Sequence, residues 1–115
     1  MTFRQARVHD QMRDWCAEYF KLHPSAGALL TITDFTMSPD MKYATILISV
    51  LPEKAENQVL EFAQRQLKDL RDYVKERAKM RVFPFFKIEI DVGEKRRQAF
   101  DDVLRKAKEA DAKKS

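Results

Sequence analysis

The sequence is poor in the residues that build phosphate loops, disulfides and metal sites. Its 115 residues include two glycines, one cysteine and two histidines. Two glycines are too few for the glycine-rich loop that cradles phosphates in nucleotide-binding proteins. A single cysteine cannot form an internal disulfide, which fits a reducing cytoplasm. One cysteine and two histidines are also too few for a zinc site. We therefore expect no metal and no cofactor.

Long hydrophobic runs are missing as well. No apolar stretch approaches the roughly 20 residues that a helix needs to span a bilayer. The N-terminal sequence TFRQARVHDQ lacks the apolar segment of a secretory signal peptide. These two absences predict a soluble, cytoplasmic protein without a membrane partner.

Composition and length predict a single globular domain. Hydrophobic residues make up 44% of the chain and charged residues 35%, whereas a disordered chain would hold fewer apolar residues. A chain of this length can bury a core without disulfides. We expect one domain over residues 1–110 and a frayed tail, DAKKS, over residues 111–115.

Hydrophobic periodicity predicts a helix from Phe3 to Leu22 and then a β-hairpin. Cys16 lies on the apolar side of this helix and should be buried and inert. In the first strand the apolar phase shifts between Ile32 and Phe35. This shift indicates either a β-bulge at Thr33 and Asp34 or a strand that is buried on both faces. The sequence Ser-Pro-Asp over residues 38–40 is typical of a hairpin turn longer than two residues. Strict alternation over residues 43–50 predicts a second strand with one buried face.

A second helical pattern runs from Pro52 to about Met80. An unbroken helix would place Arg77 in the middle of the apolar stripe, so either the helix bends before Arg77 or its side chain reaches out from the edge of the core. We therefore expect a break or a change of direction within Gln66–Arg77.

The C-terminal part predicts a third strand and a last helix. Pro84 opens the strand, because the first residue of a strand tolerates a missing N–H donor, and Gly93 ends it. The last helix runs from Glu94 to about Ala110. The predicted order is helix, strand, strand, helix, strand, helix, which gives an α+β domain with helices packed on one face of a three-stranded sheet.

Positive charge is concentrated in the second helical pattern. Residues 65–81 hold seven Lys or Arg and three acidic residues, so this window carries the same net charge, +4, as the whole chain. A positive field on one helix indicates a polyanionic partner. The alternative is a solvated surface with intrahelical ion pairs, each worth only tenths of a kcal/mol.

Three short motifs follow one another along the chain. The first helix carries Arg-x-x-Arg-Val-x-x-x-Met, starting at Arg4. The second motif is the hairpin sequence MSPDMKYATILISVL, in which Ser38 and Asp40 precede a strand of alternating apolar residues. The third motif has Arg71 in the long helical pattern, Arg81 and Pro84 at the start of the last strand, and Asp91 near the end of that strand. In this order and spacing the motifs resemble those of the ribosome-binding factor A family, over residues 4–92.

The resemblance implies a type II KH-like fold and a non-catalytic, monomeric protein that takes no small-molecule substrate. Its partner would be the rRNA of the immature small ribosomal subunit, whose late maturation it would assist. The family usually bends the long helix at an Ala-x-Gly signature, whereas this sequence has Gln66, Leu67 and Lys68 there. After Asp91, Gly93 stands where members of the family usually have a polar residue. The candidate RNA-binding residues are Arg4, Arg7, Arg65, Lys68, Arg71, Lys75, Lys79 and Arg81.

Other functions remain as alternatives. Arg4 and Arg7 could equally serve only to solubilise the first helix. Three strand aromatics, Tyr43, Phe85 and Phe35, could stack on unpaired bases, but strand aromatics more often pack in a core and no RRM-type aromatic signature is present. His9 and His23 have no acid–histidine–nucleophile pattern around them, so we expect no catalysis. A protein-interaction module could use a sheet edge or the last helix, and a small-molecule or acyl-phosphate enzyme would need an anion pocket.

Overall fold

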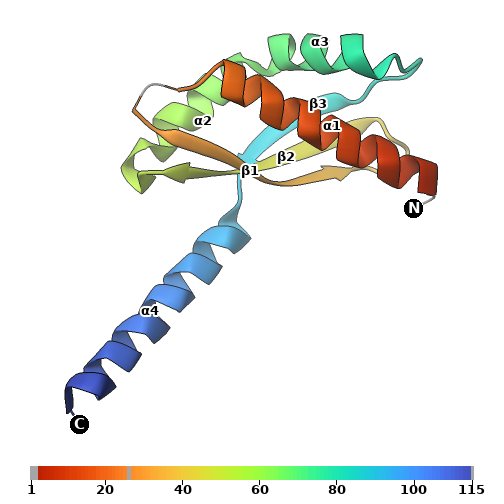
Figure 1. Ribbon diagram of the computed structural model, residues 1–115. Coiled ribbons are helices and arrows are strands. Elements are labelled where there is room, and N and C mark those ends of the chain that lie inside the picture. The colour runs from red at the N-terminus through yellow and green to blue at the C-terminus, as the bar shows by residue number, and fades with distance from the viewer. Residues whose placement is uncertain (1–2, 26, 115) are drawn as a thin grey trace.

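A computed structural model describes residues 3–25 and 27–114, with the side chains of residues 6–25 and 27–108. Within these residues the chain follows an α+β order, as Figure 1 shows. The elements are α1 (Phe3–Leu22), β1 (Leu29–Met37), β2 (Tyr43–Leu51), the 3-10 turn η1 (Glu53–Ala55), α2 (Glu56–Arg65), α3 (Leu67–Ala78), β3 (Phe85–Ile90) and α4 (Val92–Lys114).

The three strands form one sheet in the order β1-β2-β3. Strands β1 and β2 pair antiparallel through the hairpin, and β2 and β3 pair parallel. A parallel pair requires a crossover, which α2 and α3 supply. Helices α1, α2 and α3 lie on one face of this sheet, while the described part of the chain leaves the opposite face without a helix (Figure 1). The predicted fold class is therefore confirmed, although α4 projects away from the sheet.

The hairpin confirms two details of the sequence pattern. The β1–β2 register shifts between Ile32 and Asp34, so of the two predicted alternatives the bulge is the one that occurs. Exposure along β2 alternates between buried and partly exposed positions, as expected for a strand with one buried face. In the turn, the Ser38 hydroxyl donates to Asp40 Oδ1 at 2.6 Å, and the Lys42 N–H donates to the same atom at 3.1 Å.

The core lies between the sheet and the three helices. Cys16 is fully buried there, as predicted, and burial raises the pKa of its thiol to about 12, which disfavours the reactive thiolate. Fully buried side chains from every layer meet around it: Met12 of α1, Phe35 of β1, Ile46 and Ile48 of β2, and Leu70 and Val74 of α3.

The predicted break in the long helix occurs at Gln66. The Gln66 N–H lies 3.1 Å from the carbonyl oxygens of both Phe62 and Ala63, and its own carbonyl accepts from the Leu70 N–H at 2.8 Å. Its side chain accepts a 2.6 Å hydrogen bond from the Tyr19 hydroxyl of α1. The interruption therefore forms without a glycine, at the residues that the resemblance aligns with an Ala-x-Gly signature.

The boundary between the last strand and the last helix differs from the prediction. Strand β3 ends at Ile90, and α4 already begins at Val92, so Val92 and Gly93 belong to the helix. The cause is Asp91, because its Oδ1 accepts the Glu94 N–H at 2.9 Å. This contact satisfies a free N–H in the first turn, as an N-cap residue does. The helix then continues to Lys114.

Candidate nucleic-acid interface

The solvent side of α3 is divided into a basic and an acidic sector. At about 100° per residue, Lys68, Arg71 and Lys75 fall within about 60° of one another on this helix. The acidic residues Asp69, Asp72 and Glu76 occupy a neighbouring sector of similar width. Lys68 and Lys75 are exposed. We call Lys68, Arg71 and Lys75 the basic sector; it adjoins the segment that leads into β3, since Arg71 contacts that segment.

Arg71 is held by the protein itself. Its Nε donates to the Pro84 carbonyl at 3.0 Å, and its Nη2 donates to the Phe83 carbonyl at 3.2 Å. The guanidinium also lies over the rings of Phe83 and Phe85, with Cζ 5.3 Å and 4.9 Å from the two centroids. Arg71 is half-buried, so its first role is to fix the end of the α3–β3 connection beside the sheet.

Arg77, the residue that conflicted with the apolar stripe, folds back over α3. Its guanidinium lies 3.4 Å from the centroid of Tyr73, and Nη1 donates to the Tyr73 carbonyl at 3.0 Å. The Tyr73 hydroxyl in turn donates to Glu18 of α1 at 2.6 Å, and this hydrogen bond raises the pKa of Tyr73. This side of α3 therefore contacts α1.

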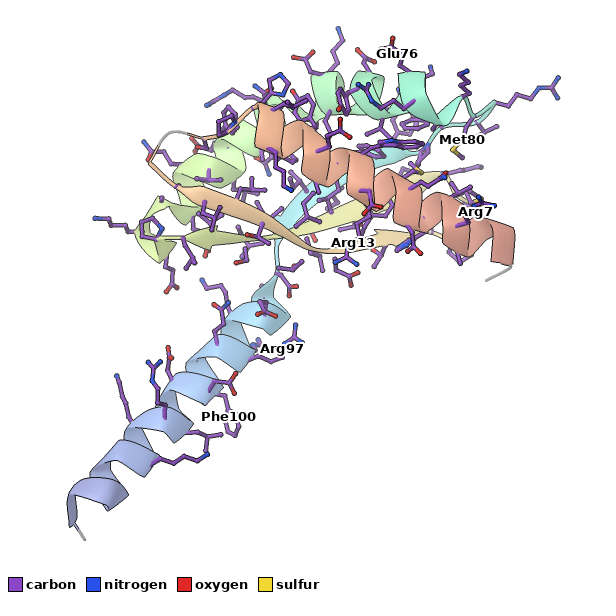
Figure 2. All side chains as sticks on the ribbon, viewed as in Figure 1. Arg7, Arg13, Glu76, Met80, Arg97 and Phe100 are labelled. Atoms are coloured by element: carbon purple, nitrogen blue, oxygen red, sulfur yellow. The ribbon has the colours of Figure 1, made fainter. Side chains whose placement is uncertain are left out.

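The remaining candidate residues lie at the ends of the helices. Lys79 caps α3 in a left-handed conformation, with φ 51°, and Arg81 is exposed in the following loop. Arg7 is exposed near the start of α1, at the same end of the molecule as Met80 (Figure 2). Arg65 is exposed in the last turn of α2. The side chain of Arg4 lies outside the described residues.

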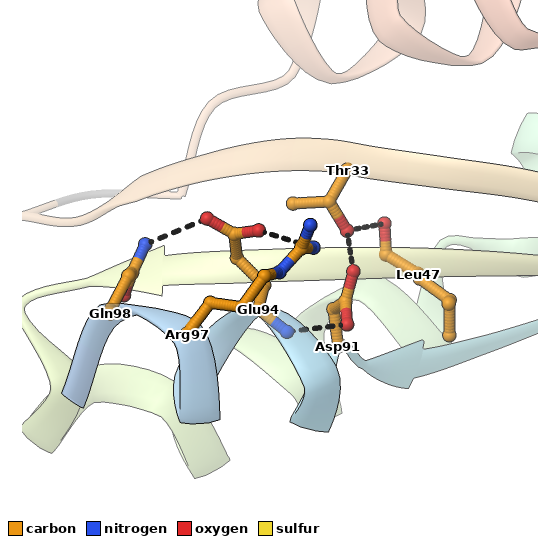
Figure 3. Close-up of polar contacts among 6 residues, drawn as sticks. All are labelled: Thr33, Leu47, Asp91, Glu94, Arg97 and Gln98. Atoms are coloured by element: carbon orange, nitrogen blue, oxygen red, sulfur yellow. Dashed lines mark hydrogen bonds and ion pairs between the residues drawn. The ribbon is translucent and has the colours of Figure 1, made fainter. Parts of the chain in front are cut away.

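Asp91 joins three parts of the fold, as Figure 3 shows. Its Oδ2 accepts the Thr33 hydroxyl of the β1 bulge at 2.6 Å, while Oδ1 caps α4. Thr33 also contacts the Leu47 carbonyl at 3.2 Å. The hydrogen bond from Thr33, followed by that from the Glu94 N–H, lowers the pKa of Asp91. Asp91 belongs to the third motif of the family resemblance, which gave it no role. Its hydrogen bonds show that its role is structural.

Two strand aromatics stand outside the core. Phe35 is fully buried, as expected of a strand aromatic, but Tyr43 and Phe85 are each 62% exposed. They face one another across the β2–β3 pair, on the sheet face opposite the helices. The alternation of both strands was a signal for this placement, since Ala44 and Phe86 take the core-facing positions.

Two pockets among the described residues lack the anion site that a phosphate-handling enzyme would need. A pocket of about 420 Å³ between α1 and β1 is lined mainly by apolar side chains such as Phe20, Leu30 and Phe62. A second, of about 240 Å³ at the start of α4, is lined by Glu53, Glu56, Glu94 and Asp102. The ammonium of Lys95 in that pocket is already paired with Glu53 and Glu56 at 3.1 Å each.

The described residues contain neither a metal-binding cluster nor a membrane-spanning helix. Over residues 3–25 and 27–114, no group of three or more His, Cys, Asp or Glu side chains is placed to hold a metal ion. Over the same ranges, every helix is too short or too polar to cross a membrane.

The fold and the site together define a class: a small α+β domain of KH-like type that exposes basic side chains along one helix. Its particular family follows from comparison with known proteins. A sequence model described as "Ribosome-binding factor A" matches residues 4–104. The chain therefore belongs to the ribosome-binding factor A family.

Individual relatives agree with this assignment. Ribosome-binding factor A of Clostridium botulinum (strain Hall) is 29% identical over 103 residues, which cover 89% of this chain and 78% of the relative. The crystal structure of the Thermus thermophilus factor has a TM-score of 0.66 at 21% identity, covering 74% of this chain and 93% of that one. A homology model of the Thermus thermophilus factor, fitted into the cryo-EM map of a 30S–factor complex, has a TM-score of 0.62 at 19% identity, with coverages of 72% and 90%.

Proposed function

We propose that this protein is a non-catalytic, RNA-binding assembly factor that associates with the immature small ribosomal subunit and assists late maturation of its rRNA. Family membership supports a ribosomal partner, and a structural neighbour was fitted into a complex with the 30S subunit. In this proposal residues 1–110 form the single functional domain. The protein works as a cytoplasmic monomer without a small-molecule substrate.

The basic sector of α3 is the observation that carries the proposal. Lys68 and Lys75 project from one side of a helix that Leu70 and Val74 anchor in the core, so the two charges are held on a rigid support. Cations placed in this way neutralise RNA phosphates and release counterions, which gives affinity with little sequence information.

The other basic candidates extend this surface in the proposal. Lys79 and Arg81 continue it beyond the C-terminal end of α3, while Arg4 and Arg7 of α1 and Arg65 of α2 add charge at its borders. Arg71 serves mainly to position the neighbouring loop, because two backbone carbonyls already bind its guanidinium.

Salt dependence and charge reversal test this function. If about four phosphates are engaged, log K for small subunits should fall with log salt at a slope of about −3 to −4. Reversing Lys68 and Lys75 to Glu should reduce cosedimentation with small subunits and flatten this slope.

A matched control separates local contact from net charge. Reversing Arg96 and Lys106 of α4 to Glu changes the net charge equally, but these side chains lie outside the basic sector. The control should bind nearly as well as the unmodified chain. Equal loss for both variants, or binding that does not depend on salt, would overturn the proposed interface.

A second candidate function has one specific observation in its favour. Helix α4 exposes Phe100 and Val103 at 64% each and Leu104 at 44%, and Figure 2 shows Phe100 pointing to solvent. Such an apolar stripe would suit a protein groove. Nuclease treatment before cosedimentation distinguishes the two functions, because a protein contact would survive the loss of RNA.

A further inference from the structure

The open face of the sheet carries an aromatic pair at its edge. Tyr43 and Phe85 are directly opposed in the parallel β2–β3 register, with ring centroids 6.2 Å apart and planes inclined by 35°. Their backbones are fixed by a 2.8 Å hydrogen bond from the Phe85 N–H to the Lys42 carbonyl. The two rings therefore form one surface, which we call the aromatic platform.

Core packing does not account for this pair. Both rings are 62% exposed, although the neighbouring Ala44 is buried. Cross-strand aromatic pairs stabilise a sheet modestly, whereas contiguous apolar surface with polar residues at its rim is typical of a binding site.

The charges around the aromatic platform fit a polyanion. Arg71 lies over the Phe85 ring and joins the platform to the basic sector of α3. Lys42 precedes Tyr43, and Lys87, the next open-face position on β3, is exposed but paired with Glu89 at 2.8 Å. Arg71, which protein carbonyls hold in place, is therefore the cation that contacts the platform, and Lys42 adjoins it in sequence and is exposed.

We propose that the aromatic platform stacks unpaired bases of a single-stranded RNA segment. The rings would receive the bases, and Lys42 and the basic sector of α3 would contact the adjoining phosphates. Stacking suits single strands because every base has a π-face, whereas bases inside a duplex cannot reach a flat protein surface. This inference rests on the proposed RNA-binding function and adds to it a preference for unpaired RNA.

Binding of defined RNAs to the full chain tests the proposal. The probes are a single-stranded oligouridine, a single-stranded oligoadenosine and a blunt duplex of equal charge. Replacing Tyr43 and Phe85 together by Ala should weaken both single-stranded probes about 10-fold or more and leave duplex binding nearly unchanged. The conservative pair Tyr43→Phe and Phe85→Tyr, which keeps both rings, should bind like the unmodified chain.

Control measurements keep the outcomes separate. Val103→Ala removes an equally exposed apolar side chain from α4 and should have no effect. Photo-crosslinking of 5-bromouridine RNA to the unmodified protein, followed by peptide mapping, gives a result that does not depend on the folding of a variant; it should label Tyr43 or Phe85.

Three results would overturn the aromatic platform: single-stranded binding that survives the alanine pair, equal losses on duplex and single strand, or crosslinks confined to other elements. Loss of small-subunit cosedimentation with retained stacking would instead contradict only the ribosomal assignment.

Discussion

Asp91 and Arg71 show how much a single polar side chain does in this small domain. The carboxylate of Asp91 is 9% exposed and connects the β1 bulge to the start of α4. The guanidinium of Arg71 fixes two successive carbonyls before β3. Both contacts link segments that are far apart in sequence, so both should be visible in stability measurements.

Replacing Asp91 by Asn should destabilise the fold in a pH-dependent way. Because its folded-state pKa is lowered, the stabilisation from the carboxylate is complete above its unfolded pKa of about 4 and is lost as the pH falls through the lower folded value. We expect a loss of about 1–3 kcal/mol near neutral pH, which shrinks as the pH falls below about 4. Urea unfolding at a series of pH values measures this.

Thr33→Val is the matched control for Asp91. It removes the hydroxyl that donates to Asp91, and the two substitutions combined should cost less than the sum of the single losses. An Asp91→Asn deficit that stays constant with pH would contradict the role assigned to the charge.

Arg71 and Lys75 should give opposite results although both are basic residues of α3. Arg71→Met removes two hydrogen bonds to carbonyls and should lower the free energy of unfolding by about 2 kcal/mol. Lys75→Met should change stability by less than about 0.5 kcal/mol but reduce the salt slope of RNA binding by about 1. Chemical unfolding and salt-dependent binding measure the two effects, and equal destabilisation by both variants would refute the distinction.

At the scale of the elements, the sequence predicted most of the fold because its apolar residues follow the period of each element. The alternation from Ala44 to Val50 fixed β2, and the phase shift near Thr33 indicated the bulge. The conflict at Arg77 predicted a break, but not its position. At that position Gln66 accepts a hydrogen bond from Tyr19, a contact between helices that leaves no periodic pattern in the sequence.

The candidate site was predicted less completely for a related reason. Helical spacing places Arg71 beside Lys75, yet only the three-dimensional fold shows that the chain returns to bind its guanidinium. The exposure of Tyr43 and Phe85 likewise depends on which sheet face the helices cover. The general tendency of strand aromatics to pack in a core argued against an exposed pair, although the alternation along both strands placed the two rings opposite the core-facing side chains.

The C-terminal end of α3 allows a test at this scale. Lys79 has φ 51°, a left-handed conformation that costs most residues about 1–2 kcal/mol and glycine much less. Lys79→Gly should therefore raise the free energy of unfolding by up to about 1 kcal/mol, while weakening RNA binding through the lost charge. Thermal unfolding should show the gain in stability, and RNA binding by the same sample should show the loss of affinity. A destabilised variant would mean that the Lys79 side chain itself supports the helix cap.

In the whole molecule, α4 stands apart from the rest of the fold (Figure 1). Its contacts with the domain are at its start, where Lys95 pairs with Glu53 and Glu56 and Asp91 caps the first turn. The described side chains from Val103 onward are exposed.

Deleting residues 103–115 should therefore leave the domain folded. We expect the free energy of unfolding to change by less than about 0.5 kcal/mol, while the helical circular-dichroism signal falls with the lost turns. A shorter chain ending at Ile90 provides the contrast, because it also removes Asp91 and should be clearly destabilised. Loss of cooperative unfolding in the first deletion would show that the distal helix supports the fold.

The projecting helix also affects how the protein's size is measured. The radius of gyration is 17.4 Å, whereas a compact chain of this length would have about 13 Å, and about 17 Å is typical of a compact chain twice as long. A single copy should therefore leave a gel-filtration column ahead of compact standards of its mass, where a dimer would be expected. Light scattering measures the molar mass directly and therefore distinguishes a monomer from a dimer.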